Sequence, residues 1–266
     1  MRVACIQMCS GHAIAPNLET VAKQLEQAST QHVQLALLPE DFSFIAKNHK
    51  ERSENAKQYP AILAFLSAQA KQHGLWLIAG STLAPIENSD KLHNRSLIID
   101  PDGHIQSEYD KMHLFDAHLK HESWQESKHT EAGQCPTMVN LDEQWKVGVS
   151  ICYDLRFPEL YRHYSKQGCN ILTIAAAFTV PTGKAHWEVL LRARAIENQC
   201  YVLASAQSGQ HDDGRKTYGH SMMINPWGEI IAELEQGEGL IVAELSWDDL
   251  QTIRQRMPAL QHRRIV

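Results

Sequence analysis

The chain lacks the features that mark several large classes of protein. No apolar run reaches the roughly 18 residues of a membrane-spanning helix, so we expect none. The first residues, MRVACIQM, show no long apolar region followed by a small-residue cleavage site, so we expect no secretory signal. Basic residues number 25 against 31 acidic ones. The one basic cluster, His262 to Arg264, indicates a solvated tail or a subunit contact, and we expect no nucleic-acid binding.

Paired cysteines are also missing. The six cysteines form no CxxC pair: Cys5, Cys9, Cys135, Cys152, Cys169 and Cys200. A chain of 266 residues without a signal peptide is not a disulfide-stapled scaffold. We therefore expect a cytoplasmic protein whose cysteines are reduced thiols, most of them buried as small apolar side chains.

Two common ligand-binding patterns are incomplete. Four histidines lie at irregular spacing with no cysteine pair beside them: His113, His118, His121 and His129. That spacing fits no zinc pattern. The tetrapeptide TGKA (182–185) superficially suggests a phosphate-binding loop, but Phe178 and Ala185 stand where that motif needs glycine and serine or threonine. The sequence therefore predicts neither a zinc site nor a phosphate-binding loop of this type.

What the chain does contain is a regular alternation of apolar strands and amphipathic helices. The predicted strands cover residues 3–8, 35–39, 75–80, 92–99, 104–110, 146–151, 171–178, 201–207, 219–224, 229–234 and 239–245. The predicted helices cover residues 17–29, 60–72, 158–167 and 186–198. Apolar strands without alternation are buried on both faces. This predicts a layered α/β sandwich with two sheets inside and helices outside.

The organisation of the chain is expected to be simple. Two similar halves follow one another without a linker-like composition, which predicts one domain over residues 1–266. Its core is expected to cover about residues 1–245, with a C-terminal tail over 246–266. Between the halves, residues 112–134 are polar and have no clear period. Such a segment inside a compact domain is usually functional or disordered.

Cys152 is the first residue with a chemical interpretation. It directly follows the strand KVGVSI, and Pro158 suits the first position of the next helix. A cysteine at a strand-to-helix turn is held out of the sheet, and the field of the helix N-terminus lowers the pKa of its thiol. From this context alone a buried, inert cysteine is still favoured, as it is for Cys169 and Cys200.

Glu40 and Lys111 each follow a predicted strand. A carboxylate at the end of the apolar strand LALLP is costly unless it is paired or faces a cleft, and α/β proteins place their sites at strand ends. A simple strand-end cap fits Glu40 as well, with Asp41 as a solvated neighbour. Lys111 is a weak signal alone, because Asp110 beside it could neutralise its charge.

Taken together, these positions resemble the nitrilase superfamily of carbon–nitrogen hydrolases. The similarity extends from VACIQM to about Leu245 and is carried by LALLPE, YDKMHLFD, SICYDLRFPELYR and AHWEVLLRARAIENQCYVLASAQ. It is closest to the branch of deaminated glutathione amidases. The resemblance implies a four-layer α-β-β-α sandwich, and it reverses the inert interpretations of Glu40, Lys111 and Cys152.

The resemblance also implies covalent hydrolysis of an amide. Cys152 is the expected nucleophile and Glu40 the general base. Lys111 is expected where negative charge develops on the carbonyl oxygen, together with the backbone N–H of Tyr153. No metal or organic cofactor is implied. The expected partner is a small-molecule amide, and the expected assembly is a homodimer or larger homo-oligomer that associates through the helices near 158–167 and 186–198.

Further residues are assigned by the same resemblance. A second active-site glutamate is expected in the loop WQESKHTEAG, which indicates Glu126, with Glu122 as the alternative. Arg156 is expected to bind the carboxylate of a 2-oxo acid amide, because a planar guanidinium suits a carboxylate. Phe178 and Thr182 are expected beside it in the substrate pocket, in the loop after ILTIAAAF.

Three alternatives remain open from the sequence. An omega-amidase acting on 2-oxoglutaramate shares much of the pattern. A nitrilase proper fits less well, because the branch resemblance indicates amides. A catalytically silent scaffold on the same fold would be expected to have lost one of the three catalytic residues, and here Glu40, Lys111 and Cys152 are all present.

Overall fold

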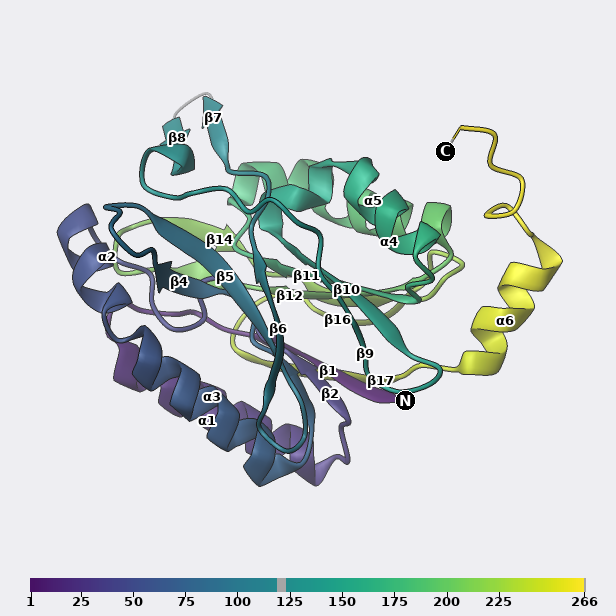
Figure 1. Ribbon diagram of the computed structural model, residues 1–266, viewed down its shortest axis with the longest axis horizontal. Helices are drawn as coiled ribbons and strands as arrows, with labels where there is room; N and C mark the ends of the chain where they lie inside the picture. The colour runs from purple at the N-terminus through teal and green to yellow at the C-terminus, as the bar shows by residue number, and fades with distance from the viewer. Residues whose placement is uncertain (119–122, 266) are drawn as a thin grey trace.

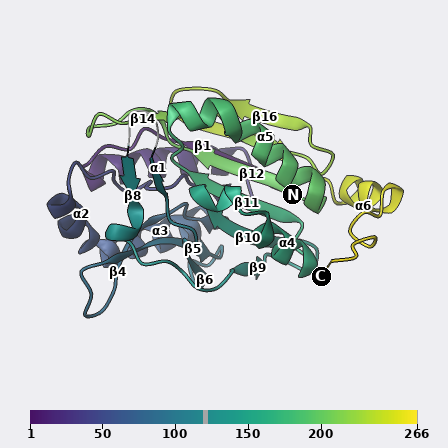
Figure 2. The same cartoon turned by 90° about the horizontal axis from the view of Figure 1, so that it is seen from above.

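The computed structural model describes residues 1–118 and 123–265. Two sheets lie face to face, with helices on both outer sides (Figures 1 and 2). In Figure 1, α1 and α3 lie below the sheets, and α4 and α5 lie above them. The predicted four-layer α-β-β-α sandwich is confirmed.

The first sheet has seven strands and is covered by helices from the N-terminal third of the chain. Its strand order is β17 (Gly239–Glu244), β1 (Arg2–Gln7), β2 (Leu35–Leu37), β3 (Trp76–Ile78), β5 (Leu92–Ile99) and β4 (Thr82–Pro85), with β6 (Ile105–Asp110) also paired to β5. The helices of this half are α1 (Ile14–Thr30), α2 (His49–Ala56) and α3 (Tyr59–His73). Strands β1, β2 and β3 are parallel to one another.

The second sheet has six strands and is covered by helices of the C-terminal half. Its strand order is β16 (Ile230–Leu234), β15 (Ser221–Ile224), β12 (Tyr201–Ala206), β11 (Ile171–Ala176), β10 (Lys146–Ile151) and β9 (Met138–Asn140). The helices of this half are α4 (Pro158–Lys166) and α5 (Val180–Asn198). Strands β10, β11 and β12 are parallel. Helix α5 begins six residues earlier than predicted, so Thr182 lies in its first turn rather than in a loop.

Several elements were not predicted from the sequence. The polar segment 112–134 contains β7 (Asp116–His118), β8 (Ser123–Gln125) and the 3₁₀ helix η1 (Glu126–Lys128). A second small ribbon consists of β13 (Ser208–Gln210) and β14 (Lys216–Tyr218), and a second 3₁₀ helix is η2 (Cys152–Arg156). The expected tail contains α6 (Trp247–Arg256), whose Leu250 is fully buried. The core therefore continues past the predicted limit at residue 245.

The core follows the two-residue period of the strands. In β1, Val3 and Cys5 pack between the two sheets, whereas Ala4 and Ile6 pack against α1 and α3. Strand β11 repeats this on the other side, since Ile171 faces the first sheet and its neighbours face α4 and α5. Each central strand is thus buried on both faces, which explains the unbroken apolar runs in the sequence.

The two sheets are joined by hydrogen bonds near the carboxyl ends of their parallel strands. The Oγ of Ser205 lies 2.8 Å from the carbonyl oxygen of Ile6 and 2.7 Å from that of Leu37, and its single proton is shared between the two. Gln207 donates to the carbonyl oxygen of Glu40 at 3.0 Å. These contacts fix the strand ends of one sheet against those of the other.

Two further observations concern membrane-spanning helices and the state of the cysteines. No helix among the described residues is long and apolar enough to cross a membrane. All six cysteines lie within the described residues and are free thiols. Cys5, Cys169 and Cys200 are fully buried, as expected for small apolar side chains.

Candidate active site

Glu40 lies just beyond the end of β2, in the interior between the two halves. Its Oε1 accepts hydrogen bonds from Lys111 Nζ at 2.8 Å and Asn94 Nδ2 at 3.0 Å. Its Oε2 accepts one from the backbone N–H of Ala177, which follows β11 in the other sheet, at 2.9 Å. Only 4% of Glu40 is exposed. The carboxylate is therefore paired and fully hydrogen-bonded, as a buried charge requires.

The backbone around Glu40 depends on a close approach that only glycine permits. Gly80 has a φ of +44°, and a Cβ there would lie 2.0 Å from the carbonyl oxygen of Pro39. The residue after it, Ser81, donates its N–H to that same carbonyl at 3.2 Å. Without glycine at position 80 the turn that carries Glu40 could not pack here.

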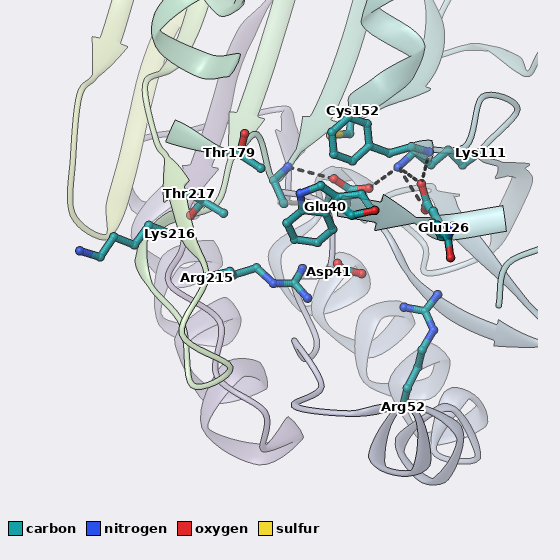
Figure 3. A pocket seen from close by; sticks show the side chains of 15 residues that line it. Glu40, Asp41, Arg52, Lys111, Glu126, Cys152, Thr179, Arg215, Lys216 and Thr217 are labelled. Carbon is teal, nitrogen blue, oxygen red and sulfur yellow. Dashed lines mark hydrogen bonds and ion pairs between the residues drawn. The ribbon is translucent and has the colours of Figure 1, made fainter. Parts of the chain in front are cut away.

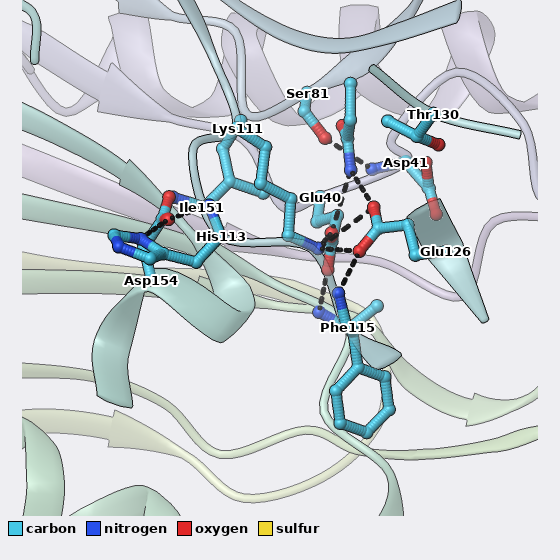
Figure 4. Close-up of polar contacts among 12 residues, drawn as sticks. Glu40, Asp41, Ser81, Lys111, His113, Phe115, Glu126, Thr130, Ile151 and Asp154 are labelled. Carbon is cyan, nitrogen blue, oxygen red and sulfur yellow. Dashed lines mark hydrogen bonds and ion pairs between the residues drawn. The ribbon is translucent and has the colours of Figure 1, made fainter. Parts of the chain in front are cut away.

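Lys111 lies between two carboxylates (Figure 4). Its Nζ is 2.8 Å from Glu40 Oε1 and 2.9 Å from Glu126 Oε2. Glu126 also accepts the backbone N–H of Phe115 at 2.7 Å, which ties η1 to the segment after β6. The expectation that Asp110 could neutralise Lys111 is wrong. Asp110 pairs with Arg95 instead, with Arg95 Nε and Asp110 Oδ1 2.7 Å apart.

The charges of this cluster shift one another's pKa values. Burial lowers the pKa of Lys111, but the carboxylates of Glu126 and Glu40 outweigh burial and raise that pKa well above its ordinary value. Burial raises the pKa of Glu126, but the charge of Lys111 and the Phe115 N–H outweigh it and lower that pKa. Lys111 and Glu126 are therefore both charged at neutral pH.

Cys152 follows β10 with a backbone conformation that is unusual for a residue with a side chain. Its φ is +49°, in the left-handed region. Such strain persists only where the surroundings enforce it, and it is common at functional sites. Asp154 supplies part of that enforcement, because its carboxylate accepts the backbone N–H of Ile151 at 2.8 Å and the hydroxyl of Tyr109 at 2.7 Å. The other oxygen of Asp154 accepts the backbone N–H of His113 at 3.0 Å (Figure 4).

The thiol of Cys152 differs from the sequence-based expectation. Helix α4 does not begin directly after it, since η2 intervenes. Burial and the negative charge of Glu40 raise the pKa of the thiol well above its ordinary value, and Lys111 lowers it only in part. The expected depression of the pKa by a helix N-terminus is therefore wrong. The group is therefore a protonated thiol at neutral pH, and it would need a base to act as a nucleophile.

Two hollows meet at Cys152. The larger, here called the main pocket, has a volume of about 210 Å³ and contains Glu40, Lys111 and Glu126 (Figure 3). Its lining residues are Glu40, Asp41, Arg52, Lys111, Phe115, Ser123, Trp124, Gln125, Glu126, Cys152, Ala177, Thr179, Arg215, Lys216 and Thr217. The smaller, here called the side cleft, has a volume of about 20 Å³. Its lining residues are Phe115, Cys152, Tyr153, Arg156, Ala177, Phe178, Thr179 and Thr182.

The structure brings together the residues that the sequence singled out. Glu40, Lys111, Glu126 and Cys152 line the main pocket. All four expected substrate-binding residues line the side cleft together with Cys152: Tyr153, Arg156, Phe178 and Thr182. The guanidinium of Arg156 lies over the rings of Tyr153 and Phe178, at 5.6 and 5.4 Å from their centroids. The alternative second glutamate, Glu122, lies outside the described residues.

Other site residues were missed. Asn94 bridges the carboxylates, with its Nδ2 3.0 Å from Glu40 and 3.4 Å from Glu126. Asp41 lines the main pocket rather than facing solvent, so its interpretation as a merely solvated neighbour is wrong. Arg52 and Arg215 line the same pocket from elements without a recognisable motif. Only Asp41 carried a signal, through its position beside Glu40.

The arrangement suits hydrolysis at a carbonyl group. A thiol adjoins a buried carboxylate that can take its proton, and a charged lysine can stabilise an oxyanion. The second carboxylate, Glu126, lies on the other side of that lysine.

Comparison with known proteins agrees with this chemistry. The carbon–nitrogen hydrolase family profile matches residues 2–255. The chain is 42% identical over 264 residues to the deaminated glutathione amidase of Synechocystis sp. strain PCC 6803, covering 98% of this chain and 97% of that protein.

Solved structures share the fold over the full length. The Caenorhabditis elegans NitFhit protein matches with a TM-score of 0.92 and 37% identity, over 99% of this chain. The match covers 65% of the NitFhit chain, just under two thirds of it. Nit3 of Saccharomyces cerevisiae, a member of branch 10 of the nitrilase superfamily, matches with a TM-score of 0.88 and 29% identity over 100% of this chain and 97% of that one. The chain belongs to the carbon–nitrogen hydrolase family.

Proposed function

We propose that the protein is an amidase that hydrolyses deaminated glutathione to 2-oxoglutarate and cysteinylglycine, a reaction of metabolite repair. One observation carries this proposal. The buried cluster of Glu40, Lys111 and Glu126 adjoins Cys152 in a chain that is 42% identical to a protein named deaminated glutathione amidase. Relatives with the same name in Yersinia enterocolitica and mouse are 37% and 39% identical over nearly the whole chain.

The first half of the proposed reaction forms a thioester. Glu40 takes the proton of the Cys152 thiol, and the sulfur attacks the amide carbonyl carbon. Negative charge moves to the carbonyl oxygen, where Lys111 and the backbone N–H of Tyr153 stabilise it. The carbon–nitrogen bond then breaks, and protonated Glu40 returns its proton to the leaving amine.

The second half releases the acid. Water attacks the thioester carbonyl and loses a proton to Glu40 or Glu126. The carbon–sulfur bond breaks, and the sulfur of Cys152 recovers that proton from the same glutamate that took it from water. The sum is amide plus water to acid plus amine, with no net change in the enzyme. The raised pKa of Cys152 supports a base-assisted attack rather than a standing thiolate.

The acyl half of the substrate is proposed to occupy the side cleft. Arg156 would bind the carboxylate of the 2-oxo acid, and Phe178 and Thr182 would line its carbon chain. Arg156 Nη1 lies 3.2 Å from His186 Nδ1, a contact that helps to fix its guanidinium. The cleft is narrow, so we expect its side chains to move apart when the substrate binds.

A substrate panel tests the proposal. The kcat/KM for deaminated glutathione should exceed that for 2-oxoglutaramate, measured by release of 2-oxoglutarate. The reverse order would favour an omega-amidase. No turnover of any amide, with no acyl adduct on the thiol, would favour a catalytically silent scaffold.

We further propose a cytoplasmic, single-domain protein that forms a homodimer or larger assembly through α4 and α5. Val189 and Ile196 on α5 are 62% and 44% exposed, which supports an apolar contact there. Light scattering should report at least twice the monomer mass. A strictly monomeric protein at micromolar concentration would contradict this assembly.

A further inference from the structure

The main pocket has a cationic end that the proposed mechanism does not use. Arg52 extends from α2, and Arg215 extends from the turn between β13 and β14. Figure 3 shows their guanidinium groups on either side of Asp41, on the side of Glu40 away from Cys152. Asp41 interacts electrostatically with both arginines, so the three side chains form one cluster.

Arg52 is a partly buried cation that forms no ion pair with any described residue. No carboxylate among residues 1–118 and 123–265 lies within salt-bridge distance of its guanidinium. Its Nη2 donates to the Thr130 hydroxyl at 2.8 Å, and its Nε is buried without a hydrogen-bond partner. Burial lowers the pKa of Arg52, against the charges of Asp41 and Glu126. A guanidinium held this way retains donors for an anionic group.

Arg215 is held in place by one of its donors only. Its Nε donates to Asp213 Oδ2 at 2.6 Å, and its guanidinium lies over the Trp124 ring at 5.2 Å from the centroid. Its side chain is 28% exposed. The two terminal nitrogens make no hydrogen bond to another described residue. They therefore offer the flat edge that binds a carboxylate through two parallel hydrogen bonds.

The chemistry of the reaction fixes which half of the substrate enters this end. The leaving nitrogen must receive its proton from Glu40, and Glu40 lines the main pocket but not the side cleft. The leaving amine therefore extends into the main pocket, away from Arg156. In the proposed reaction that amine is cysteinylglycine, which ends in a free carboxylate.

We propose that Arg52 and Arg215 bind the terminal carboxylate of a peptide leaving group and thereby select peptide amides over simple amides. This inference rests on the proposed function. An amide that releases ammonia has no group that reaches the arginines, so it gains nothing from them. The ratio of kcat/KM for deaminated glutathione to that for 2-oxoglutaramate measures the contribution of the pair.

The test uses Arg52→Gln and Arg215→Gln with three substrates. These are deaminated glutathione, its derivative with a terminal carboxamide, and 2-oxoglutaramate. Each variant should lower the ratio of deaminated glutathione to 2-oxoglutaramate by about 10- to 100-fold, as expected for one hydrogen bond to a charged group. For the wild-type protein, replacing the terminal carboxylate with a carboxamide should lower kcat/KM by a similar factor. On the carboxamide substrate, the variants should lower kcat/KM little further. Arg2→Gln, an exposed arginine at the start of β1, is the matched control and should keep the wild-type ratio.

The outcomes separate this inference from the proposed function. A wild-type protein inactive on deaminated glutathione contradicts the proposed function and the arginine assignment with it. If the wild type is active but the Arg52 and Arg215 variants lose the same factor in kcat/KM on all three substrates, only the arginine assignment is contradicted. Equal use of the carboxylate and carboxamide substrates by the wild type would contradict it too.

Discussion

The two hollows that meet at Cys152 are built in opposite ways. Apart from Phe115, the side cleft is lined by residues close to Cys152 in sequence or in the connection after the neighbouring strand, and its lining cation, Arg156, lies over aromatic rings. The main pocket draws its charges from segments far apart in the chain, including Arg52 and Arg215. The cleft carries a single guanidinium among rings, whereas the pocket combines three carboxylates with Lys111, Lys216 and the two arginines.

This difference assigns the two halves of a substrate. A cleft with one arginine among aromatic rings suits a short oxo acid, whose carboxylate is its only charge. The main pocket contains Glu40, the proposed proton donor to the leaving nitrogen, and extends to Arg52 and Arg215. Variants in the main pocket should therefore respond to the leaving group and variants in the side cleft to the acyl group, whereas loss of Cys152, which lines both, should abolish turnover of every substrate.

The largest effect is expected at Cys152, which lines both hollows. Cys152→Ala should fold normally and lose amidase activity on every substrate, by on the order of 10⁴-fold or more, because no other group can carry the acyl half. Activity is measured by 2-oxoglutarate release and folding by thermal unfolding. Retained turnover would contradict the thioester mechanism and with it the division at Cys152.

The next effect isolates the side cleft. Arg156→Ala should raise KM by about 10- to 100-fold for deaminated glutathione and 2-oxoglutaramate alike, because both carry the same 2-oxo acid carboxylate. This equal response distinguishes Arg156 from Arg52, whose loss should affect only the peptide amide. Initial rates on both substrates check it, with Arg2→Ala as control. An unchanged KM would exclude Arg156 as the carboxylate anchor.

The smallest expected effect concerns the main pocket, where a substitution should lower KM rather than raise it. Asp41 interacts with the same two arginines. Burial and the charge of Glu40 raise the pKa of its carboxyl to about 7, although the charges of Arg52, Arg215 and Lys111 act to lower it. As pH rises through 7, ionised Asp41 competes with the substrate carboxylate. Asp41→Asn should therefore lower KM for deaminated glutathione about two- to fivefold at pH 8, and less at pH 6.

The same carboxyl provides an independent check through stability. A raised pKa in the folded state means that folded protein binds the proton more tightly than unfolded chain, whose Asp41 titrates near 3.8. The wild type should lose stability relative to Asp41→Asn as pH rises from about 4 to about 7. A constant difference between their melting temperatures across that range would contradict the assigned titration.

The sequence predicts the layers from local pattern, because unbroken apolar strands report burial on both faces. The roles of Glu40, Lys111 and Cys152 were implied by the family resemblance, since the local context of each residue alone left an inert interpretation open. Helix α2 was missed because HKERSENA has almost no apolar period, and only its Ala56 is buried. Arg52 on that helix therefore carried no signal at all.

Properties that depend on the assembled interior were beyond the sequence. The pKa of Cys152 was expected to fall, because the neighbouring helix is visible in the sequence, whereas Glu40 and the burial around the thiol are contributed by distant segments. Arg215 lies in a turn and reaches the pocket only when the ribbon of β13 and β14 packs there. Such contacts arise from tertiary packing, not from spacing.

We propose that Cys152 carries the acyl half of the substrate while the amine leaves through the main pocket. Rapid acid quenching of the protein with deaminated glutathione, followed by peptide mass spectrometry, tests this directly. We expect a 2-oxoglutaryl adduct on the peptide that contains Cys152, together with free cysteinylglycine released before 2-oxoglutarate. Simultaneous release of both products without any adduct on Cys152 would contradict it.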